Sequence, residues 1–303
     1  MAFLKLIRWP NLLMMSGSLL LIRYTFFVPL GIPYVLDDLH FALLVLSTAC
    51  IGAAGYIVND LYDLENDRIN KPNRMQIGVV FNERFAWNAF YALFLIGGAL
   101  GWYLGQHTGK MLYGAINLIT GFWLYLYAAD FKGRPLLGNV MISFLSAGVL
   151  TYPLFFDVLP RFPLSESDSG HQALLILGIY FCLAFVISWL RELIKDMEDE
   201  TGDRSSGLRT MPIAWGSLPS KILIGLLGGL LVTAFGWAAW SSWQGNKWSS
   251  TYIFLALFLP SLWVWVKSFS AHESLQFRKL SIGLKVIMAA AILSIPVITY
   301  SSI

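Results

Sequence analysis

The chain has 303 residues, of which 57% are hydrophobic and only 13% are charged, and its mean hydropathy is +0.63. Soluble domains carry about 25% charged residues, so this composition excludes a soluble globular fold. The net charge is only +3, but in a membrane protein the placement of the basic residues carries more information than their sum.

Nine long apolar runs, bounded by charged residues, glycine or proline, follow one another along the chain. A membrane-spanning helix needs about 20 predominantly apolar residues, and each run approaches or reaches that length. We therefore predict an all-α polytopic membrane protein that forms a single domain over residues 1–303. The predicted spans are 12–30, 41–58, 86–104, 111–128, 137–156, 172–190, 222–240, 250–267 and 283–300.

The first predicted span contains a charged residue, Arg23. An ionisable residue inside a membrane span is by default a candidate for a functional site. Arg23 either binds an acidic group of the acceptor or has a structural role, in which it snorkels to the membrane interface or pairs with another residue inside the protein. The sequence leaves both roles open.

With nine spans, successive loops lie on opposite sides of the membrane, and the basic residues divide unevenly between the two sides. The N-terminal tail and the loops after the second, fourth, sixth and eighth spans hold 17 of the 21 lysines and arginines, whereas the other side holds three. Because cytoplasmic loops are enriched in lysine and arginine, the N-terminus and these charged loops are predicted to be cytoplasmic. The protein is then expected in the cell membrane.

Ten of the 18 acidic residues fall in two short stretches, 59–67 and 192–203, after the second and sixth spans. Each stretch has aspartates at positions i, i+3 and i+7, which on a helix share one arc about 60° wide. The two trios are Asp60, Asp63 and Asp67, and Asp196, Asp199 and Asp203. Both belong to loops on the same predicted side, so six carboxylates can converge at one membrane face.

Such convergence is costly without cations, because two like charges about 5 Å apart repel by about 3 kcal/mol at an effective dielectric constant near 20. Oxygen ligands with no histidine or cysteine nearby suit Mg²⁺, which takes further ligands from substrate phosphates. Interleaved basic side chains can bind the phosphate oxygens directly. These are Arg68, Lys71, Arg74, Arg191, Lys195, Arg204 and Arg209. The pattern therefore predicts a Mg²⁺ site that binds a diphosphate.

The two stretches resemble the paired aspartate-rich motifs of the UbiA-type family of intramembrane prenyltransferases. The first resembles N-D-x-x-D-x-x-x-D from Asn59 to Asp67, and the second resembles K-D-x-x-D-x-x-x-D from Lys195 to Asp203. The resemblance covers most of the chain and implies a bundle of nine transmembrane helices. It differs in one place, since Lys71-Pro72-Asn73-Arg74 stands where many members carry an Arg-Pro pair. Weaker points of similarity are Arg8-Trp9-Pro10-Asn11, Tyr127, Lys132, Arg134, Gly138-Asn139 and Thr210-Met211-Pro212.

This resemblance implies Mg²⁺-dependent transfer of a polyprenyl group from a prenyl diphosphate to a lipophilic acceptor. The metal ligands that it implies are Asp60, Asp63, Asp196 and Asp199. The residues expected to take part in catalysis are Lys195, which contacts the diphosphate, and Asp67 and Asp203, which orient the acceptor or complete the metal shell. The expected substrate-binding residues are Asn59, Arg68, Arg74, Tyr127, Lys132, Arg191 and Arg204. The expected partners are the diphosphate donor, the acceptor and membrane lipids, with no nucleic acid.

The identity of the acceptor stays open at this point. The segments 6–11 and 55–60 are most similar to those of family members that alkylate geranylgeranylglyceryl phosphate. Aromatic quinone precursors such as hydroxybenzoate or dihydroxynaphthoate, and haem, are alternative acceptors. A divalent-cation transporter is an alternative from another class, although transporters usually place ionisable residues near the middle of the membrane. The D-G-x-x-A-R-type run of the CDP-alcohol phosphotransferases does not occur in the chain.

Overall fold

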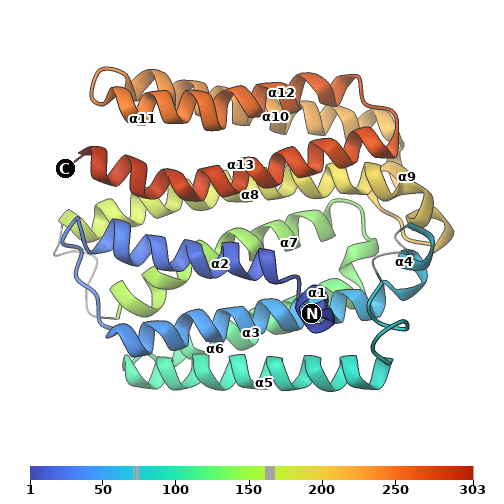
Figure 1. Cartoon of the computed structure of the whole chain (residues 1–303), viewed down its shortest axis with the longest axis horizontal. Helices are drawn as coiled ribbons and strands as arrows, with labels where there is room; N and C mark the ends of the chain where they lie inside the picture. The colour runs from blue at the N-terminus through green and yellow to red at the C-terminus, as the bar shows by residue number, and fades with distance from the viewer. Residues whose placement is uncertain (71, 73–74, 161–167, 303) are drawn as a thin grey trace.

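The computed structural model describes residues 1–70, 72, 75–160 and 168–302, and these form a bundle of helices (Figure 1). Lipid offers no hydrogen bonds to an exposed backbone, so apolar segments of this length satisfy their backbone groups internally as helices. In these ranges the structure contains no β-strand, only an isolated bridge between Ile77 and Phe81. The all-α prediction is confirmed.

The N-terminal half of the chain places the first aspartate motif at the end of one long helix and in the short helix after it. Its α-helices are α1 (Ala2–Leu6), α2 (Trp9–Leu21), α3 (Asp38–Tyr62), α4 (Leu64–Asn70), α5 (Glu83–His107), α6 (Met111–Ala129) and α7 (Leu137–Gly148). Tighter or wider helical segments lie among them: η1 (Ile22–Phe27), η3 (Phe131–Gly133), η4 (Val149–Thr151) and η5 (Leu154–Val158). Of these, η1 and η5 are π-helical and η3 and η4 are 3₁₀-helical.

The C-terminal half places the second motif inside the longest helix of the protein. Its elements are α8 (Asp168–Ser205), α9 (Met211–Trp215), α10 (Ser217–Ser242), α11 (Lys247–Tyr252), η6 (Ile253–Phe258), α12 (Leu259–Phe269) and α13 (Ser274–Ser302). The sequence pattern predicted a span over 172–190 followed by a charged loop, but α8 continues as a helix to Ser205. The second motif therefore lies in a helix and not in a loop.

Eight helical segments of the described residues are long and apolar enough to cross a membrane. They match the predicted spans from 41–58 to 283–300, and only residue 172 of the span 172–190 falls outside its segment. The predicted span 12–30 is not among them; it falls on α2 and η1, and Arg23 in η1 interrupts its apolar run. The predicted count of nine spans is therefore not confirmed.

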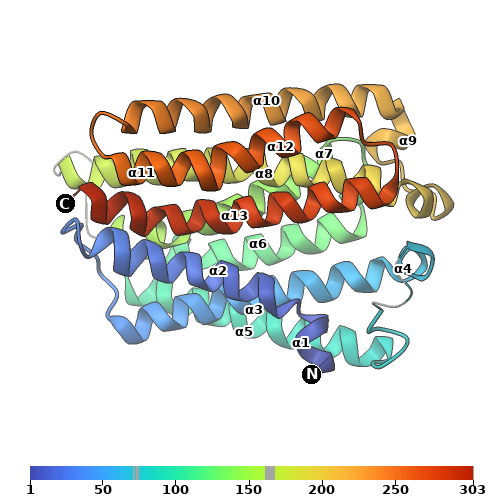
Figure 2. The same cartoon turned by 45° about the horizontal axis from the view of Figure 1, so that its top comes forward.

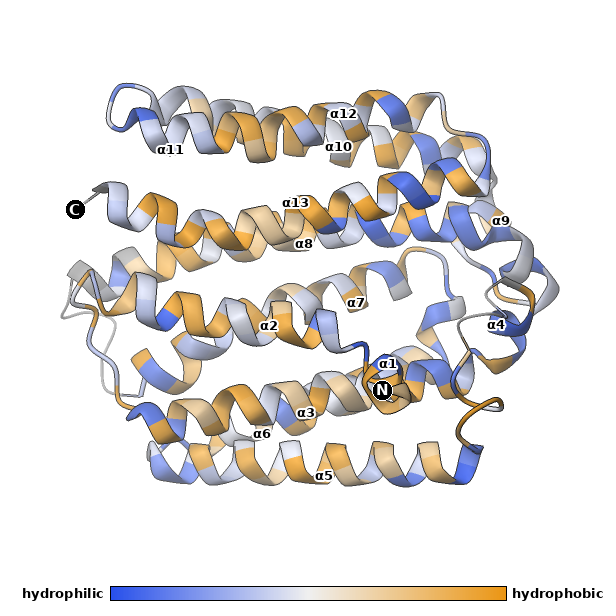
Figure 3. Ribbon diagram, in the orientation of Figure 1, coloured by the Kyte–Doolittle hydropathy of each residue, from blue (hydrophilic) through white to orange (hydrophobic). Residues whose placement is uncertain are grey.

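The long helices run side by side along the longest axis of the molecule (Figures 1 and 2). Apolar residues cover their middle parts, and polar residues gather at the end where α4 and α9 lie (Figure 3).

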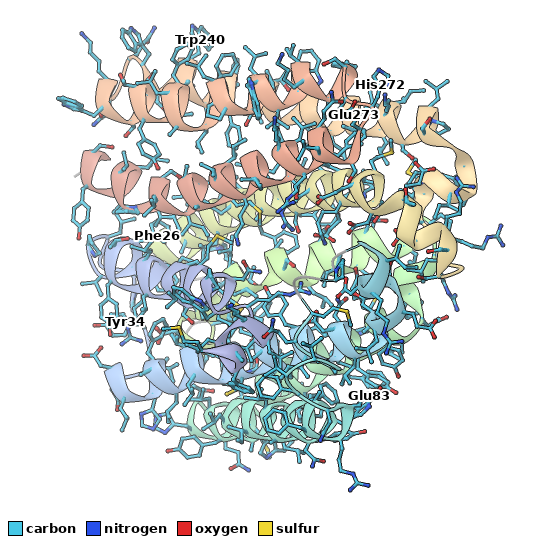
Figure 4. All side chains as sticks on the ribbon, turned by 45° about the vertical axis from the view of Figure 1, so that its right-hand side comes forward. Phe26, Tyr34, Glu83, Trp240, His272 and Glu273 are labelled. Atoms are coloured by element: carbon cyan, nitrogen blue, oxygen red, sulfur yellow. The ribbon has the colours of Figure 1, made fainter. Side chains whose placement is uncertain are left out.

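Four exposed tryptophans lie near the opposite end, around the turn between α10 and α11, and Figure 4 labels one of them, Trp240. Tryptophan is enriched at membrane–water interfaces. The protein is an integral membrane protein. The four tryptophans are Trp237, Trp240, Trp243 and Trp248.

Small residues bring α5 and α6 into close contact. A Cβ atom added to Gly98 would lie 2.2 Å from Leu118, and one added to Gly105 would lie 2.5 Å from the backbone nitrogen of Gly114. Helices in lipid associate through such close packing, since burial of apolar surface drives association little there. α5 also packs on α3, so this pair of helices supports the helix that carries the first aspartate motif.

Candidate active site

The first aspartate motif lies where α3 ends and α4 begins. Asn59 and Asp60 are in the last turn of α3, Asp63 is its C-terminal cap, and Asp67 is in α4. The side-chain amide of Asn59 donates a hydrogen bond of 2.6 Å to Asp63. The trio therefore does not lie in one continuous helix, although backbone hydrogen bonds from Asp63 to Asn59 and from Asp67 to Asp63 keep the helical spacing across the break.

The second motif keeps the predicted helical arc, because Asp196, Asp199 and Asp203 all lie in the continuous helix α8. Asn139, near the start of α7, donates a hydrogen bond of 2.9 Å to Asp196. The helix α7 packs along α8 over this region. Sequence reasoning noted Asn139 only as a weak point of similarity and gave it no role.

The two motifs meet through Asn66 of α4, whose side-chain amide donates a hydrogen bond of 2.8 Å to Asp203 of α8. Both side chains are buried, with exposed fractions of 7% for Asn66 and 4% for Asp203. A buried polar pair of this kind fixes the relative position of two elements, because each partner would be costly to bury alone. The structure thus joins residues 137 positions apart, as the repeated motif predicted, through an asparagine that the prediction missed.

Lys132, in the short segment η3, lies between the carboxylates of the two motifs. Its ammonium donates a hydrogen bond to Asp63, and its further acidic neighbours include Asp203 and Asp67. Burial would lower the pKa of Lys132, but the charge and hydrogen bond of Asp63 outweigh it and raise the pKa overall. The lysine therefore stays positively charged and reduces the repulsion among these carboxylates.

Arg8, the N-terminal cap of α2, forms an ion pair with Asp60 of the first motif. The guanidinium nitrogen Nη2 lies 2.5 Å from Asp60 Oδ1, and the group stacks 5.1 Å from the centre of the Tyr56 ring. Burial would lower the pKa of Arg8, but the Asp60 carboxylate raises it overall. Arg8 was noted in the sequence only as a point of similarity, and the structure makes it part of the site.

On α8, Glu192 lies between two basic residues that the sequence predicted as substrate contacts. Arg191 donates a hydrogen bond of 3.1 Å to Glu192, and Lys195 donates one of 3.0 Å to the other carboxylate oxygen. Glu192 was not predicted to belong to the site. It holds both cations in place on the helix that carries the second motif.

Of the other predicted substrate-binding residues, one lies near both motifs and two are exposed at the surface. Tyr127, at the end of α6, has carboxylates of both motifs, Asp63 and Asp196, among its electrostatic neighbours. Arg68 is exposed. Arg204 is exposed and forms a 2.9 Å ion pair with Glu200 one turn earlier on α8. Arg74 lies outside the described residues.

The donor set of the site fits a hard cation such as Mg²⁺. No three carboxylate, histidine or cysteine groups of the described residues form a closed metal cage. In this structure, amide and basic side chains instead hold the aspartates: Arg8 on Asp60, Lys132 on Asp63, Asn139 on Asp196 and Asn66 on Asp203. Mg²⁺ commonly binds to one or two carboxylates and completes its shell with water and phosphate oxygens. The residues therefore fit a metal that shares its ligands with a phosphorylated substrate.

Two residues of the first motif also border a small open recess. Asp60 and Asp67 line it together with Leu64 and the segment from Met75 to Ile77. The recess shows that carboxylates on α3 and α4 face a common space, although the helix between them is interrupted.

Comparison with known proteins gives consistent results. The model of the UbiA prenyltransferase family matches residues 18–283. A digeranylgeranylglyceryl phosphate synthase of Methanococcus aeolicus is 30% identical over 230 residues, which cover 74% of this chain and 72% of the relative. A solved structure of a digeranylgeranylglyceryl phosphate synthase superposes with a TM-score of 0.65 at 24% identity, covering 98% of this chain and 96% of the other. A UbiA homologue from Archaeoglobus fulgidus, bound to GPP and Mg²⁺, superposes with a TM-score of 0.59 at 17% identity, covering 97% of this chain and 99% of the homologue.

Proposed function

The chain belongs to the UbiA prenyltransferase family, and from this membership we propose that it adds a geranylgeranyl chain to geranylgeranylglyceryl phosphate. The name of the Methanococcus aeolicus relative describes a product with two geranylgeranyl chains on one glyceryl phosphate. A synthase that adds the second chain needs a prenyl diphosphate donor and an acceptor that carries the first. The observation that carries the chemistry is the junction of the two motifs at Lys132 and Asn66.

Mg²⁺ is the cofactor that this junction supports. Asp60, Asp63, Asp196 and Asp199 would hold the metal, which would neutralise the diphosphate and stabilise it as a leaving group. All four are oxygen donors, as Mg²⁺ prefers. The Archaeoglobus fulgidus homologue with bound GPP and Mg²⁺ supports the assignment.

The reaction breaks the C–O bond between the allylic carbon of the donor and its diphosphate, which leaves with the electron pair. Lys132 and Lys195 are positioned to stabilise the charge that builds up on the diphosphate oxygens. The hydroxyl oxygen of the acceptor forms the new bond to carbon, and its proton passes to the released diphosphate. Asp67 and Asp203 orient this hydroxyl or complete the metal shell.

The remaining predicted contacts take supporting roles in this proposal. Asn59 fixes Asp63 by its hydrogen bond, and Tyr127 closes the site on the side of α6. Arg68 and Arg204 are exposed at the same end of the bundle, where they attract anionic head groups. The uneven distribution of lysine and arginine supports placing this end in the cytoplasm.

Removal of the metal is the direct test of this function. Purified protein with radiolabelled geranylgeranyl diphosphate and geranylgeranylglyceryl phosphate is expected to form the doubly prenylated lipid only when Mg²⁺ is present. Excess EDTA should stop the reaction, and added Mg²⁺ should restore it. Product formation at an unchanged rate in EDTA would contradict the proposed metal dependence.

The acceptor is tested separately, by mass spectrometry of the lipids that disappear when the protein is removed from its cell. Loss of an ether lipid with two prenyl chains supports the proposal, whereas loss of a prenylated quinone or of a prenylated haem assigns a different acceptor. Mg²⁺ flux into proteoliposomes without any prenyl donor would revive the transporter alternative.

Replacing Lys132 with glutamine is expected to raise the KM for the prenyl diphosphate by at least about tenfold. A hydrogen bond that involves a charged group contributes about 1.5–3 kcal/mol, and Lys132 is the cation between Asp63 and Asp203. Steady-state kinetics at saturating acceptor measures this change. The matched control is Arg134→Gln, because Arg134 is exposed and pairs with Asp130. Equal KM values for both variants would remove Lys132 from the donor site.

A further inference from the structure

Lys285 lies within the span formed by α13, eleven residues after the helix begins. At 1.5 Å per residue this places it about 16 Å along the helix from Ser274. Its ammonium donates a hydrogen bond of 2.6 Å to the side chain of Asn11 in the first turn of α2. Among the described residues, no carboxylate lies within ion-pair distance of Lys285. A charge inside a membrane span, without a counter-ion, indicates a functional site.

Two further cations lie close to Lys285. Its charged neighbours are Arg191 of α8 and Arg8 at the start of α2, and both repel its positive charge. Arg8 and Arg191 each have one acidic partner, Asp60 and Glu192, but Glu192 also pairs with Lys195. Positive charge is therefore in excess where these three helices meet.

One side-chain donor at this junction also lacks a partner. The Nε atom of Arg191 is buried and has no hydrogen-bond partner in the structure. The helix α2 begins at Arg8 without a side-chain cap, so the positive end of its dipole faces this cluster. Arg8 itself adopts a left-handed backbone conformation with φ 51°, which is strained for a residue other than glycine and is typical of ligand sites.

We propose that Lys285, Arg8, Arg191 and Asn11 form a subsite for the phosphate of the lipid acceptor. This proposal rests on the function proposed above. A phosphate monoester carries a charge of about −1.5 to −2 near pH 7 and three acceptor oxygens. This charge matches the excess of positive charge, and an oxygen can accept a hydrogen bond from the unpartnered Nε of Arg191. The arginines add planar forks that suit phosphate geometry.

The position of the subsite suits this role because it adjoins the site for the diphosphate. Arg8 bridges the two through its ion pair with Asp60, and Arg191 is linked to Lys195 through Glu192. In geranylgeranylglyceryl phosphate only a few covalent bonds separate the phosphate from the free hydroxyl. A phosphate held at Lys285 therefore leaves that hydroxyl close to the donor carbon that it attacks.

The subsite also separates acceptor classes. An aromatic carboxylate such as hydroxybenzoate brings one negative charge and a flat ring, and a single arginine suffices to bind it. The three cations Arg8, Arg191 and Lys285 match a doubly charged phosphate better than a singly charged carboxylate. The gathered charge thus selects a phosphorylated lipid over an uncharged or singly charged acceptor.

The test measures binding without the donor, so that it does not depend on turnover. Isothermal titration in detergent compares geranylgeranylglyceryl phosphate with the same lipid lacking the phosphate, for the wild type and for Lys285→Gln. The wild type is expected to bind the phosphorylated lipid at least about tenfold more tightly than the lipid without phosphate. Lys285→Gln should weaken binding of the phosphorylated lipid by about tenfold and leave binding of the other lipid unchanged. Lys285→Arg should retain most of the affinity. The control is Lys279→Gln, on an exposed part of the same helix, which should behave as the wild type.

Two outcomes would overturn the subsite. One is equal affinity of the wild type for the two lipids, and the other is a Lys285→Gln variant that weakens binding of geranylgeranyl diphosphate with Mg²⁺ as much as binding of the acceptor. A wild type that binds the phosphorylated lipid selectively but never prenylates it would contradict the proposed reaction and support the subsite. Melting temperatures of the variants confirm that each one is folded.

Discussion

Replacement of Asp60 or Asp196 by asparagine is expected to lower kcat/KM for prenyl transfer by about 10²- to 10³-fold, and replacement of both is expected to abolish it. Metal-bound charge stabilisation contributes several kcal/mol to such a transition state, and each 1.4 kcal/mol corresponds to a factor of ten. Asparagine preserves the shape of the side chain and removes one charge. The measurement is product formation from radiolabelled prenyl diphosphate over a series of Mg²⁺ concentrations.

The hydrogen bonds of the two aspartates make this substitution mild for the fold. Asn139 can still donate to the amide oxygen of an asparagine at position 196, and Arg8 can do so at position 60. The control is Asp130→Asn, because Asp130 is exposed and pairs with Arg134, and the two residues lie two positions before and after Lys132. Activity of the motif variants within about threefold of this control would contradict the metal assignment.

The helical architecture was largely predictable because membrane spans obey simple rules of length and polarity. The eight spans from 41–58 to 283–300 appear as helices, but the ends of the helices did not follow from hydropathy. The polar segment after 172–190 continues α8 to Ser205, since packing against α4, α7 and α9 supports the helix beyond the apolar run. α13 likewise begins nine residues before its predicted span, and this difference moves Lys285 from a helix end into the helix.

The candidate site was predictable in part, because six aspartates with repeated spacing form a pattern that one sequence can reveal. Lys132 was predicted from the resemblance alone, and the structure places it against Asp63. Asn66 and Glu192 were missed because neither belongs to the repeated spacing of the aspartates, and a single asparagine or glutamate in an acidic stretch does not stand out in one sequence. Their role depends on tertiary contacts, such as the bond from Asn66 to Asp203, that no local spacing encodes.

Arg23 shows how tertiary contacts decide between two readings of one charged residue. Its guanidinium lies 2.6 Å from Asp157 in η5 and donates a hydrogen bond of 2.6 Å to the carbonyl oxygen of Leu36. Asp157 also accepts hydrogen bonds from the backbone of Val35 and Leu36. The exposed fractions of the side chains are 1% for Arg23 and 0% for Asp157. The pair joins η1, η5 and the segment before α3, near the end of the bundle opposite the aspartate motifs, where Figure 4 labels Tyr34.

Of the two roles that the sequence allowed for Arg23, this geometry supports internal pairing. Two π-helical segments supply the partners, η1 for Arg23 and η5 for Asp157. The rings of Tyr34 and Phe41 lie 4.3 Å and 4.5 Å from the guanidinium carbon and shield it further. An acidic substrate group would have to displace the Asp157 carboxylate from three hydrogen bonds, which makes binding at this position unfavourable.

Loss of one partner of this pair is expected to destabilise the protein strongly. Arg23→Met or Asp157→Leu should each cost about 3–5 kcal/mol, because the first leaves the buried Asp157 without a counter-ion and the second leaves the buried Arg23 with only the exposed Asp38, 3.5 Å away. That cost lowers the melting temperature by about 10 °C, measured in detergent at a fixed scan rate. The double variant should recover at least half of the loss, because it leaves no buried charge unpaired and the two effects are coupled.

The exposed pair of Arg134 and Asp130 is the matched comparison, because it has a similar distance of 2.5 Å but lies in contact with solvent. Arg134→Met and Asp130→Leu should each change the stability by less than about 1 kcal/mol. If Arg23→Met melts as the wild type does but loses affinity for the acceptor, Arg23 binds substrate and the structural role is wrong. If both single variants melt early and the double variant recovers, the arginine in the first apolar segment contributes to folding, and the charges that serve catalysis lie at the other end of the bundle.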